Sequence, residues 1–292
     1  AKGDKAELFG PTQTPDRARQ TAAGLLGIPP ENITVEITRP GGGFGRRLAA
    51  DYVAEAVQIS KMTNAPVKVT WNREDDLSGG LYRPAVRYRF EAALDELGNM
   101  IGYKLKGAGI NSGNSTRQDN FPSGAVANLK IESVEHQSPI TTNAWRAPIT
   151  NFLAYAEQSF LDEVALEAGK DPVQFRLELL DKAKNSPTGE IKYDVDRMIG
   201  VIKTAAEKSN WGKDPAVKQG FSVYFSHRSY VAQVADIVQE GGTPVLKKIT
   251  AATDCGIVVN PTGANHQVRG GIVDGMGHAM YGNLTFKDGL PT

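Results

Sequence analysis

The sequence predicts an α+β protein built from two subdomains, each a mixed or antiparallel sheet covered by helices. The first indication is a hairpin: residues 86–91 and 101–105 carry apolar side chains on alternate positions, and a turn-forming segment at 95–99 separates them. The second is a change of character after Trp211, where helix-like patterns give way to three strand-like ones. We therefore expect one subdomain over residues 1–185 and another over residues 205–292.

The first third of the chain carries clear local signals. Thr14 suits an N-cap and Pro15 suits the first helical position, so we expect a helix up to about Leu26. Apolar residues recur near helical spacing between Leu48 and Lys61 and predict a second helix. The other expected elements are strands at 6–9, 33–38 and 66–71 and a polar turn at 72–76.

The rest of the chain predicts more helices and one more group of strands. We expect helices at 152–167, 171–180 and 194–210, a linker at 182–192, strands at 220–225, 230–238 and 245–253, and a strand with a turn near 284–292. A last helix, 264–281, carries Gly270, Gly271, Gly275 and Gly277. Each mid-helix glycine costs up to about 1 kcal/mol relative to alanine, so four of them predict close packing against backbone or a cofactor.

Composition excludes several classes of protein. The 292 residues include 33 basic and 33 acidic side chains, so the formal net charge is zero, and nucleic acid is not an expected partner. No apolar stretch is long enough to span a bilayer. The lone Cys255 excludes an internal disulfide and a Cys-cluster metal site, and we expect it to be a small core residue. The four histidines show no paired metal-ligand spacing.

The most informative segment is Arg39-Pro40-Gly41-Gly42-Gly43-Phe44-Gly45-Arg46-Arg47. It lies between an expected strand and an expected helix, where glycines let the backbone turn sharply and approach a ligand. Backbone N–H groups at a helix start form an anion site, and we expect Phe44 to wall a buried ligand. The run matches neither a nucleotide-binding P-loop nor a complete dinucleotide fingerprint. It predicts an anionic cofactor, and the alternative is a purely structural turn.

Two further segments carry chemistry. Trp145-Arg146-Ala147-Pro148 lies just ahead of an expected helix and can place a guanidinium in a pocket; the alternative is a surface arginine stacked on tryptophan. Downstream, Asp254-Cys255-Gly256 leads through Asn260-Pro261 to Gln267-Val268-Arg269-Gly270-Gly271. This segment suits a phosphate or pterin amides, and the alternative is a tight strand-to-helix connection.

Together and in this order, the three segments resemble the molybdopterin-binding large subunit of the xanthine dehydrogenase and aldehyde oxidase family, in particular its bacterial isoquinoline 1-oxidoreductase beta-subunit branch. The resemblance covers nearly the whole chain. It implies a molybdenum-cofactor-binding fold and a hydroxylase that oxidises an aldehyde or an N-heterocycle. It also implies a molybdenum–pterin cofactor, whose cytosine dinucleotide form stays open, and an iron–sulfur partner subunit that accepts the electrons.

The resemblance also assigns roles to residues. It implies that Arg146 is catalytic and steers or stabilises a developing negative charge. The residues that it implies for cofactor binding are Gly42, Gly43, Phe44, Gly45, Arg46, Ala147, Gln267, Gly270 and Gly271. It implies no metal ligand from the protein.

Departures from the family pattern limit these expectations. The upstream Gly-Gln-Gly loop and the downstream loop with the base glutamate are missing, so we expect a fragment that is inactive alone and purifies without cofactor. Arg146-Ala147-Pro148 replaces the Arg-Gly-Phe of xanthine-oxidising members, which puts purine specificity in doubt. Two other classes stay open: a non-catalytic assembly module that keeps the fold, and an enzyme with a nucleotide cofactor, against which the antiparallel hairpin argues. The substrate, electron acceptor, oligomeric state and compartment are open as well.

Overall fold

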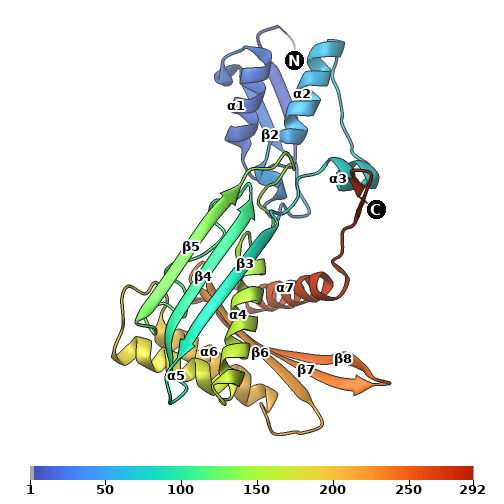
Figure 1. Ribbon diagram of the computed structural model, residues 1–292. Helices are drawn as coiled ribbons and strands as arrows, with labels where there is room; N and C mark the ends of the chain where they lie inside the picture. Colours follow the sequence, from blue (N-terminus) through green and yellow to red (C-terminus); the bar gives the residue numbers. More distant parts are fainter. Residues whose placement is uncertain (1–2, 292) are drawn as a thin grey trace. The chain divides into compact units, whose positions relative to one another are not determined.

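The computed structural model describes residues 3–291 and divides the chain into two compact units (Figure 1). The first unit comprises Ala1–Ala85, Gln137–Pro148 and Leu284–Thr292, and the second comprises Val86–His136 and Ile149–Asn283. Each unit is thus assembled from segments that are far apart in the sequence. The mixture of helices with several sheets confirms the α+β class. The expected subdomains, 1–185 and 205–292, follow chain order rather than these units and stay a prediction.

The first unit contains two small sheets and their helices. Its elements are β1 (Ala6–Gly10), α1 (Pro15–Leu26), β2 (Ile33–Ile37), α2 (Asp51–Thr63), α3 (Arg73–Gly79), β9 (Phe286–Lys287) and β10 (Leu290–Pro291). Strands β1 and β2 pair in parallel, and β9 and β10 form the short hairpin expected near the end of the sequence. A small apolar core holds β1, β2, α1 and α2 together through Ala6, Ala22, Ala23, Ile33 and Val57.

Local signals around α1 are confirmed at both ends. The helix begins at Pro15, and Gly27 ends it in the left-handed conformation with φ 71°. The Thr14 side chain, however, does not cap the helix. Its hydroxyl donates to the carbonyl of Leu48 at 3.1 Å and so ties the start of α1 to the segment that follows the glycine run.

Three local expectations in this unit are wrong. Residues 66–71 form no ladder with any strand that the structure describes, so strand-like composition was not enough without a partner. The expected turn at 72–76 lies in helix α3, because Asn72 and Asp75 form a reciprocal capping box with hydrogen bonds of 2.7 and 3.1 Å. Helix α2 starts three residues later than expected, since a 3₁₀ turn, η2 (Arg46–Leu48), precedes it.

The second unit opens with a three-stranded sheet. Strands β3 (Val86–Leu94) and β4 (Met100–Ile110) form the predicted antiparallel hairpin, and β5 (Asn128–His136), which the sequence analysis missed, joins β4 in parallel. Helix α4 (Thr150–Glu167) packs against the inner face of this sheet (Figure 1). There the rings of Phe90 and Phe160 stack with their centroids 4.9 Å apart.

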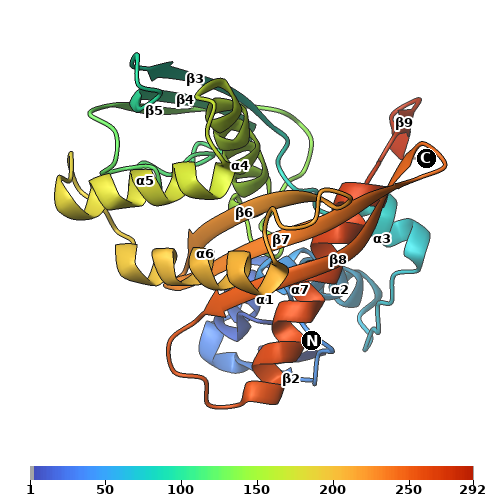
Figure 2. The same ribbon diagram turned by 90° about the horizontal axis from the view of Figure 1, so that it is seen from below.

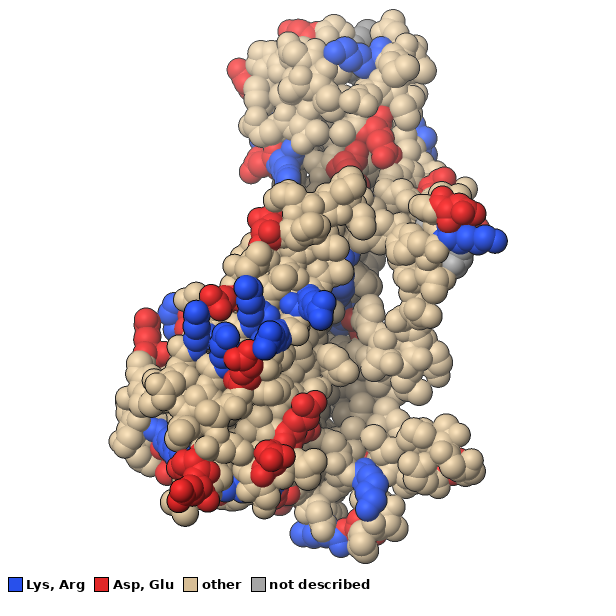
Figure 3. Space-filling model, in the orientation of Figure 1, with Lys and Arg blue, Asp and Glu red and all other residues tan. Residues whose placement is uncertain are grey.

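The outer face of this sheet is charged and solvated. Lys and Arg side chains gather over β3, β4 and β5 (Figure 3), and the register places two glutamates among them. The residues concerned are Arg87, Arg89, Lys104, Lys106 and Lys130 with Glu91 and Glu132. Glu91 pairs with Arg89 at 2.9 Å and with Lys104 at 3.2 Å. Exposed pairs of this kind contribute only about 0–1 kcal/mol each to stability, so this face adds little to the fold.

A second sheet is antiparallel and covered by a helix. Its strands are β6 (Lys218–Ser226), β7 (Ser229–Glu240) and β8 (Thr243–Asp254), which confirm the three expected strands, and their order in the sheet is β6-β7-β8. Helix α6 (Val195–Ser209) packs on this sheet, and α5 (Pro172–Asn185) lies beside α6 (Figure 2). Asp171 and Asp194 cap α5 and α6 by accepting backbone N–H groups. Helix α5 runs five residues beyond its expected end, so the linker to α6 is shorter than predicted.

A buried arginine joins three elements of the second unit. Arg176 is 0% exposed and donates to Gln158 Oε1 and to the carbonyl oxygens of Gln158 and Pro172 at 2.9–3.0 Å. It also forms an ion pair with Asp162 at 2.8 Å. Gln158 Oε1 accepts a further bond from the backbone N–H of Val223 at 3.2 Å. One guanidinium thus links α4, α5 and β6, and its burial is tolerated because its donors have partners.

None of the residues of the long helix α7 (Pro261–Tyr281) is buried, a property that it shares with the much shorter α3. Asn260 caps the first turn of α7. A Cβ added at Gly271, Gly275 or Gly277 would meet no atom within 4 Å. The expected close packing of these glycines against protein backbone is therefore not found among residues 3–291, whereas packing against a cofactor stays a prediction.

A buried carboxyl lies at the centre of the second unit. Glu157 on α4 is 1% exposed, and its polar neighbours are the phenol groups of Tyr103 on β4 and Tyr224 on β6. Burial raises the pKa of Glu157 from 4.5 to about 8, although hydrogen bonding to the two phenols opposes the shift. The carboxyl is therefore protonated and neutral at pH 7.

We expect this carboxyl to make the second unit less stable as the pH rises. The folded state holds the Glu157 proton more tightly than the unfolded state does. The stabilisation that this proton gives to the folded state is fully present below pH 4.5 and is lost as the pH rises to about 8. The slope is roughly 1 kcal/mol per pH unit. Glu157→Gln keeps the shape without the charge and should flatten the slope in urea unfolding between pH 5 and 8.5. Glu163→Gln, exposed on the same helix, is the control; equal slopes in wild type and Glu157→Gln would contradict the expectation.

Candidate functional site

The glycine run forms a strained loop between β2 and η2. Gly42 has φ 129° and Gly45 has φ 87°, values that glycine adopts without penalty. Phe44 lies between them at φ 49°, which is uncommon for a residue with a side chain. Its ring is 52% exposed. An exposed aromatic ring on a strained backbone is typical of a ligand-binding loop.

Several backbone amides in this loop are available to a ligand. Within residues 3–291, the N–H groups of Gly41, Gly42, Gly43 and Phe44 donate to no protein acceptor. The next amide, that of Gly45, is used inside the protein: it donates to Oε1 of Gln13 at 3.0 Å. Four consecutive donors beside an aromatic ring form a cradle for an oxygen-rich or anionic group.

The segment Trp145-Arg146-Ala147-Pro148, called the arginine loop below, lies directly against this cradle. The backbone N–H of Arg146 donates to the carbonyl of Phe44 at 2.6 Å, and the Arg146 guanidinium lies 5.2 Å from the centre of the Phe44 ring. A Cβ added at Gly45 would lie 3.2 Å from the Cα of Trp145, so the two loops would have to move apart slightly to accept any other residue. Ala147 also has a positive φ, of 52°. The structure thus brings together Phe44, Gly45, Arg146 and Ala147, which the sequence placed in one site.

Arg46, the other arginine predicted to belong to the site, is paired with the carboxylate of Asp51. Arg46 forms a two-pronged contact with Asp51, with N–O distances of 2.9 and 2.7 Å. The hydrogen bond to Asp51 raises the pKa of Arg46. Burial opposes ionisation of Asp51, but Arg46 outweighs it and the pKa of Asp51 is lowered. Arg46 therefore stabilises the start of α2 in addition to the ligand-binding role that the resemblance implies.

The remaining predicted residues belong to the second unit. Gln267, Gly270 and Gly271 are exposed on α7, and their i, i+3, i+4 spacing places them on one face of the helix. The segment that leads to α7 is also exposed, with Ile257 and Val259 at 93% and 92%. Cys255 lies in the same segment and is exposed, so its expected place in the core is wrong.

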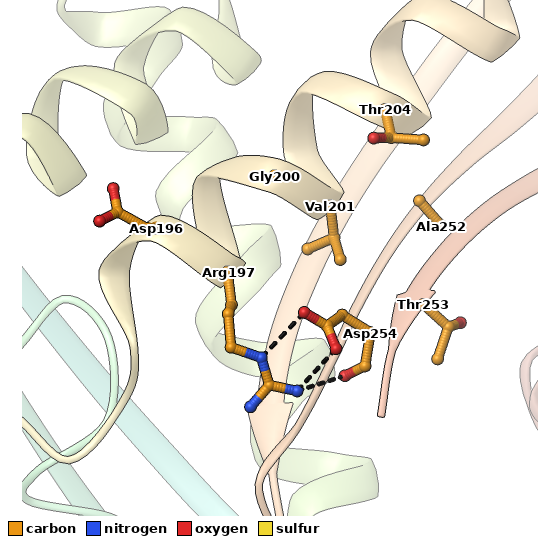
Figure 4. Close-up of a pocket in the computed structure, with 8 residues that line it drawn as sticks. All are labelled: Asp196, Arg197, Gly200, Val201, Thr204, Ala252, Thr253 and Asp254. Carbon is orange, nitrogen blue, oxygen red and sulfur yellow. Dashed lines mark hydrogen bonds and ion pairs between the residues drawn. The ribbon is translucent and has the colours of Figure 1, made fainter. Parts of the chain in front are cut away.

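A groove of about 510 Å³ lies between α6 and β8 (Figure 4). Its lining residues are Asp196, Arg197, Gly200, Val201, Thr204, Ala252, Thr253 and Asp254. Arg197 donates to both carboxylate oxygens of Asp254 at 2.8 and 2.7 Å, and this bonding lowers the pKa of Asp254 to about 2. Asp254 also accepts the N–H of Gly256 at 3.0 Å. The pair therefore fixes the end of β8, from which the exposed segment toward α7 departs.

Sequence reasoning missed three residues that support these sites. Gln13 holds the glycine loop, Arg83 donates to the carbonyl of Trp145 at 2.6 Å, and Arg197 holds Asp254. None belongs to a glycine-rich or aromatic motif, and each bonds to a residue more than 30 positions away. Only the position of Gln13, directly before the helix start Thr14-Pro15, could have drawn attention to it.

Residues 3–291 contain neither a candidate metal site nor a candidate membrane-spanning helix. No group of three or more His, Cys, Asp or Glu side chains is arranged to hold a metal ion. No helix in this part of the chain combines the length and the apolar composition that crossing a bilayer requires.

Two family models match the chain, and each describes a molybdopterin cofactor-binding domain. The first matches residues 1–180 and the second residues 156–292. The chain therefore belongs to the molybdopterin cofactor-binding domain family.

Relatives from bacteria are similar over almost the whole chain. The isoquinoline 1-oxidoreductase subunit beta of Brevundimonas diminuta is 29% identical over 98% of this chain and 38% of its own length. The membrane-bound aldehyde dehydrogenase [pyrroloquinoline-quinone] of Gluconacetobacter polyoxogenes is 27% identical over 93% of this chain and 39% of its own length. The chain thus spans about two-fifths of the length of these relatives.

Solved structures agree in fold. Quinoline 2-oxidoreductase from Pseudomonas putida 86 matches with a TM-score of 0.56 and 19% identity, over 75% of this chain and 31% of that one. CO dehydrogenase from Oligotropha carboxidovorans matches with a TM-score of 0.62 and 16% identity, over 75% and 32%. Both likenesses concern the fold.

We expect Gly45→Ala to destabilise the first unit. The left-handed backbone disfavours alanine, and the new Cβ would press against Trp145. The loss should be about 1–3 kcal/mol, measured as a lower urea midpoint. Gly24→Ala is the matched control, because Gly24 is helical and exposed, has no neighbour within 4 Å of the added Cβ, and should gain up to about 1 kcal/mol. Equal midpoints for the two variants would show that the close approach at Gly45 carries no constraint.

Proposed function

We propose that this chain is the cofactor-binding part of the catalytic subunit of a molybdenum hydroxylase that oxidises an aldehyde or an N-heterocycle. The observation that carries the proposal is the contact between the glycine loop and the arginine loop. There, four available backbone amides lie beside the Phe44 ring and Arg146. Membership of the molybdopterin cofactor-binding family supports the proposal, as does the similarity to relatives named as aldehyde or N-heterocycle oxidoreductases. The cofactor would be a molybdenum–pterin group, with the cytosine dinucleotide form open.

The residues of the first unit suit such a group. The amides of Gly42, Gly43 and Phe44 would donate to its oxygen atoms, and the Phe44 ring would exclude water from one side. When bound, the molybdenum–pterin group supplies two-electron oxidation chemistry. Arg146 would stabilise negative charge that develops on a substrate oxygen, because it is a fixed cation held over an aromatic ring. Ala147 would form part of the same wall, and Gln267, Gly270 and Gly271 would contribute polar and close-approach positions from α7.

The finer parts of the proposal concern the whole protein. Electrons would leave to an iron–sulfur partner subunit, and a base glutamate would come from sequence outside these 292 residues. The subdomains 1–185 and 205–292 would each contribute to cofactor binding, in keeping with the two family models that match the chain. The 292-residue chain alone would hold no cofactor and show no turnover. The alternative function is an assembly module that keeps the fold without catalysis.

Metal and pterin content tests this proposal. We expect about one molybdenum per chain, with releasable pterin, in the longest natural form of the protein purified from a host that makes the cofactor. A molybdoenzyme loaded by the same host is the control. A loaded control with neither molybdenum nor pterin in this protein would contradict the proposal, and so would release of a quinone instead of a pterin.

The role of Arg146 can be tested in the same loaded protein. Arg146→Met keeps the side-chain stem but removes the charge, so turnover of an aromatic aldehyde or N-heterocycle should fall by about 10²–10³ in kcat. Molybdenum content should stay near that of the wild type. Arg73→Met, at an exposed arginine of α3, is the control. Unchanged kcat in Arg146→Met would remove Arg146 from the reaction, and molybdenum without any turnover in the wild type would favour the assembly module.

A further inference from the structure

We propose that Gln13 and Arg83 are positioning residues that lock the glycine loop against the arginine loop, so that Phe44 and Arg146 face a ligand as one rigid pair. This inference rests on the proposed function, because the pair is taken to be part of the cofactor site. Neither residue belongs to the motifs that carry the family resemblance. Their placement follows from four segments of the first unit that meet at residues 13, 43–46, 83 and 145–146.

Gln13 holds the glycine loop from one side. Its Oε1 accepts the N–H of Gly45 at 3.0 Å, and its own backbone N–H donates to the carbonyl of Arg47 at 3.1 Å. A Cβ added at Gly43 would overlap the Gln13 carboxamide, so the amide plane lies directly on the loop backbone. Gln13 thus contacts the chain at Gly43, Gly45 and Arg47 and limits the conformations open to Phe44.

Arg83, in the segment between α3 and β3, holds the arginine loop. Its Nη1 donates to the carbonyl of Trp145 at 2.6 Å, and its guanidinium lies 4.5 Å from the centre of the Trp145 ring. Backbone bonds beside it reinforce this contact: the Tyr82 N–H donates to Thr141 and the Asn143 N–H donates to Tyr82, both at 3.0 Å. The segment before Arg83 therefore pairs with the segment before Trp145.

Gln13 and Arg83 support two loops that are joined by a backbone hydrogen bond between Arg146 and Phe44. Gly45 packs on Trp145, and the Arg146 N–H donates to the carbonyl of Phe44 at 2.6 Å, so the loops touch between the two supports. Because Phe44 and Ala147 both hold a positive φ, the loops need outside support to keep this geometry. Loss of either support should therefore loosen the same bond.

Hydrogen exchange of backbone amides in this chain tests, without any cofactor, whether Gln13 and Arg83 hold the two loops together. We would measure hydrogen exchange of the Gly45 and Arg146 amides by NMR in wild type, Gln13→Leu, Arg83→Met and the double variant. Each single change should speed exchange of the Arg146 amide by roughly fivefold, the effect of losing one hydrogen bond. The double variant should add little to either single change, because both act on one lock. The Ala54 amide of α2, which bonds to Ala50 at 2.9 Å, should not change.

Conservative variants separate the lock from general damage. Gln13→Glu keeps an acceptor oxygen and Arg83→Lys keeps a donor and a cation, so both should restore slow exchange of the Arg146 amide. Unchanged exchange in Gln13→Leu and Arg83→Met would overturn the proposal. Equal acceleration of Ala54 would also overturn it, because the unit would then be loosening as a whole.

A second readout tests positioning rather than structure alone. In the longest natural form purified with molybdenum, Gln13→Leu should lose molybdenum on prolonged dialysis roughly fivefold faster than wild type, and Gln13→Glu should restore retention. Faster exchange with unchanged molybdenum retention would overturn the positioning role and leave a structural bond. If the wild type holds no molybdenum while a control molybdoenzyme does, the proposed function fails and the positioning role fails with it, whereas the exchange data still decide whether the lock exists.

Discussion

The contact between Phe44 and Arg146 is the interaction on which the proposed site in the first unit depends. A backbone hydrogen bond of 2.6 Å and a ring contact of 5.2 Å join two loops that lie far apart in the sequence. Each loop contains a residue with a side chain at positive φ, and such backbone costs on the order of 1–3 kcal/mol per residue. The glycines at 43 and 45 let Gln13 and Trp145 approach the loop closely. The strained backbone persists because the bonds between the loops offset it.

The second unit shows two different ways of holding a helix. Helix α4 is fixed by its buried face, by the Arg176–Gln158 bonds and by the neutral carboxyl of Glu157 among two phenols. Helix α7 has an N-cap but no buried residue, and a Cβ added at Gly271, Gly275 or Gly277 would meet no atom within 4 Å. Since packing supplies most of the stability of a helix in a protein, α7 belongs to the low-stability part of this unit. The exposed residues proposed for ligand binding on α7 therefore lie on a weakly constrained element.

Much of the fold was predictable from local signals. The Thr14-Pro15 start and the Gly27 end delimit α1, and strict alternation predicted the hairpin of β3 and β4, because both patterns depend only on neighbouring residues. Strand β5 was missed since its partner β4 lies across a long connection, and parallel pairing leaves no turn signature. Residues 66–71 fail in the opposite way, because β-type composition does not form a strand without a partner. In α3 the capping residues Asn72 and Asp75 were visible, but the short polar segment between them resembled a turn.

For the site, each of the glycine and arginine loops alone was also compatible with a structural role, and only the family resemblance that they carry together implied a molybdenum–pterin cofactor. The pairing of these residues was not predictable. Gln13 with Gly45, Arg83 with Trp145 and Arg197 with Asp254 are contacts across 32 to 62 positions, and only the packing of the chain brings such residues together. The order and type of these residues therefore determined the family resemblance and the kind of ligand that we propose. Tertiary structure decided which side chains hold the two loops, since a hydrogen bond depends on distance in space and not on distance along the chain.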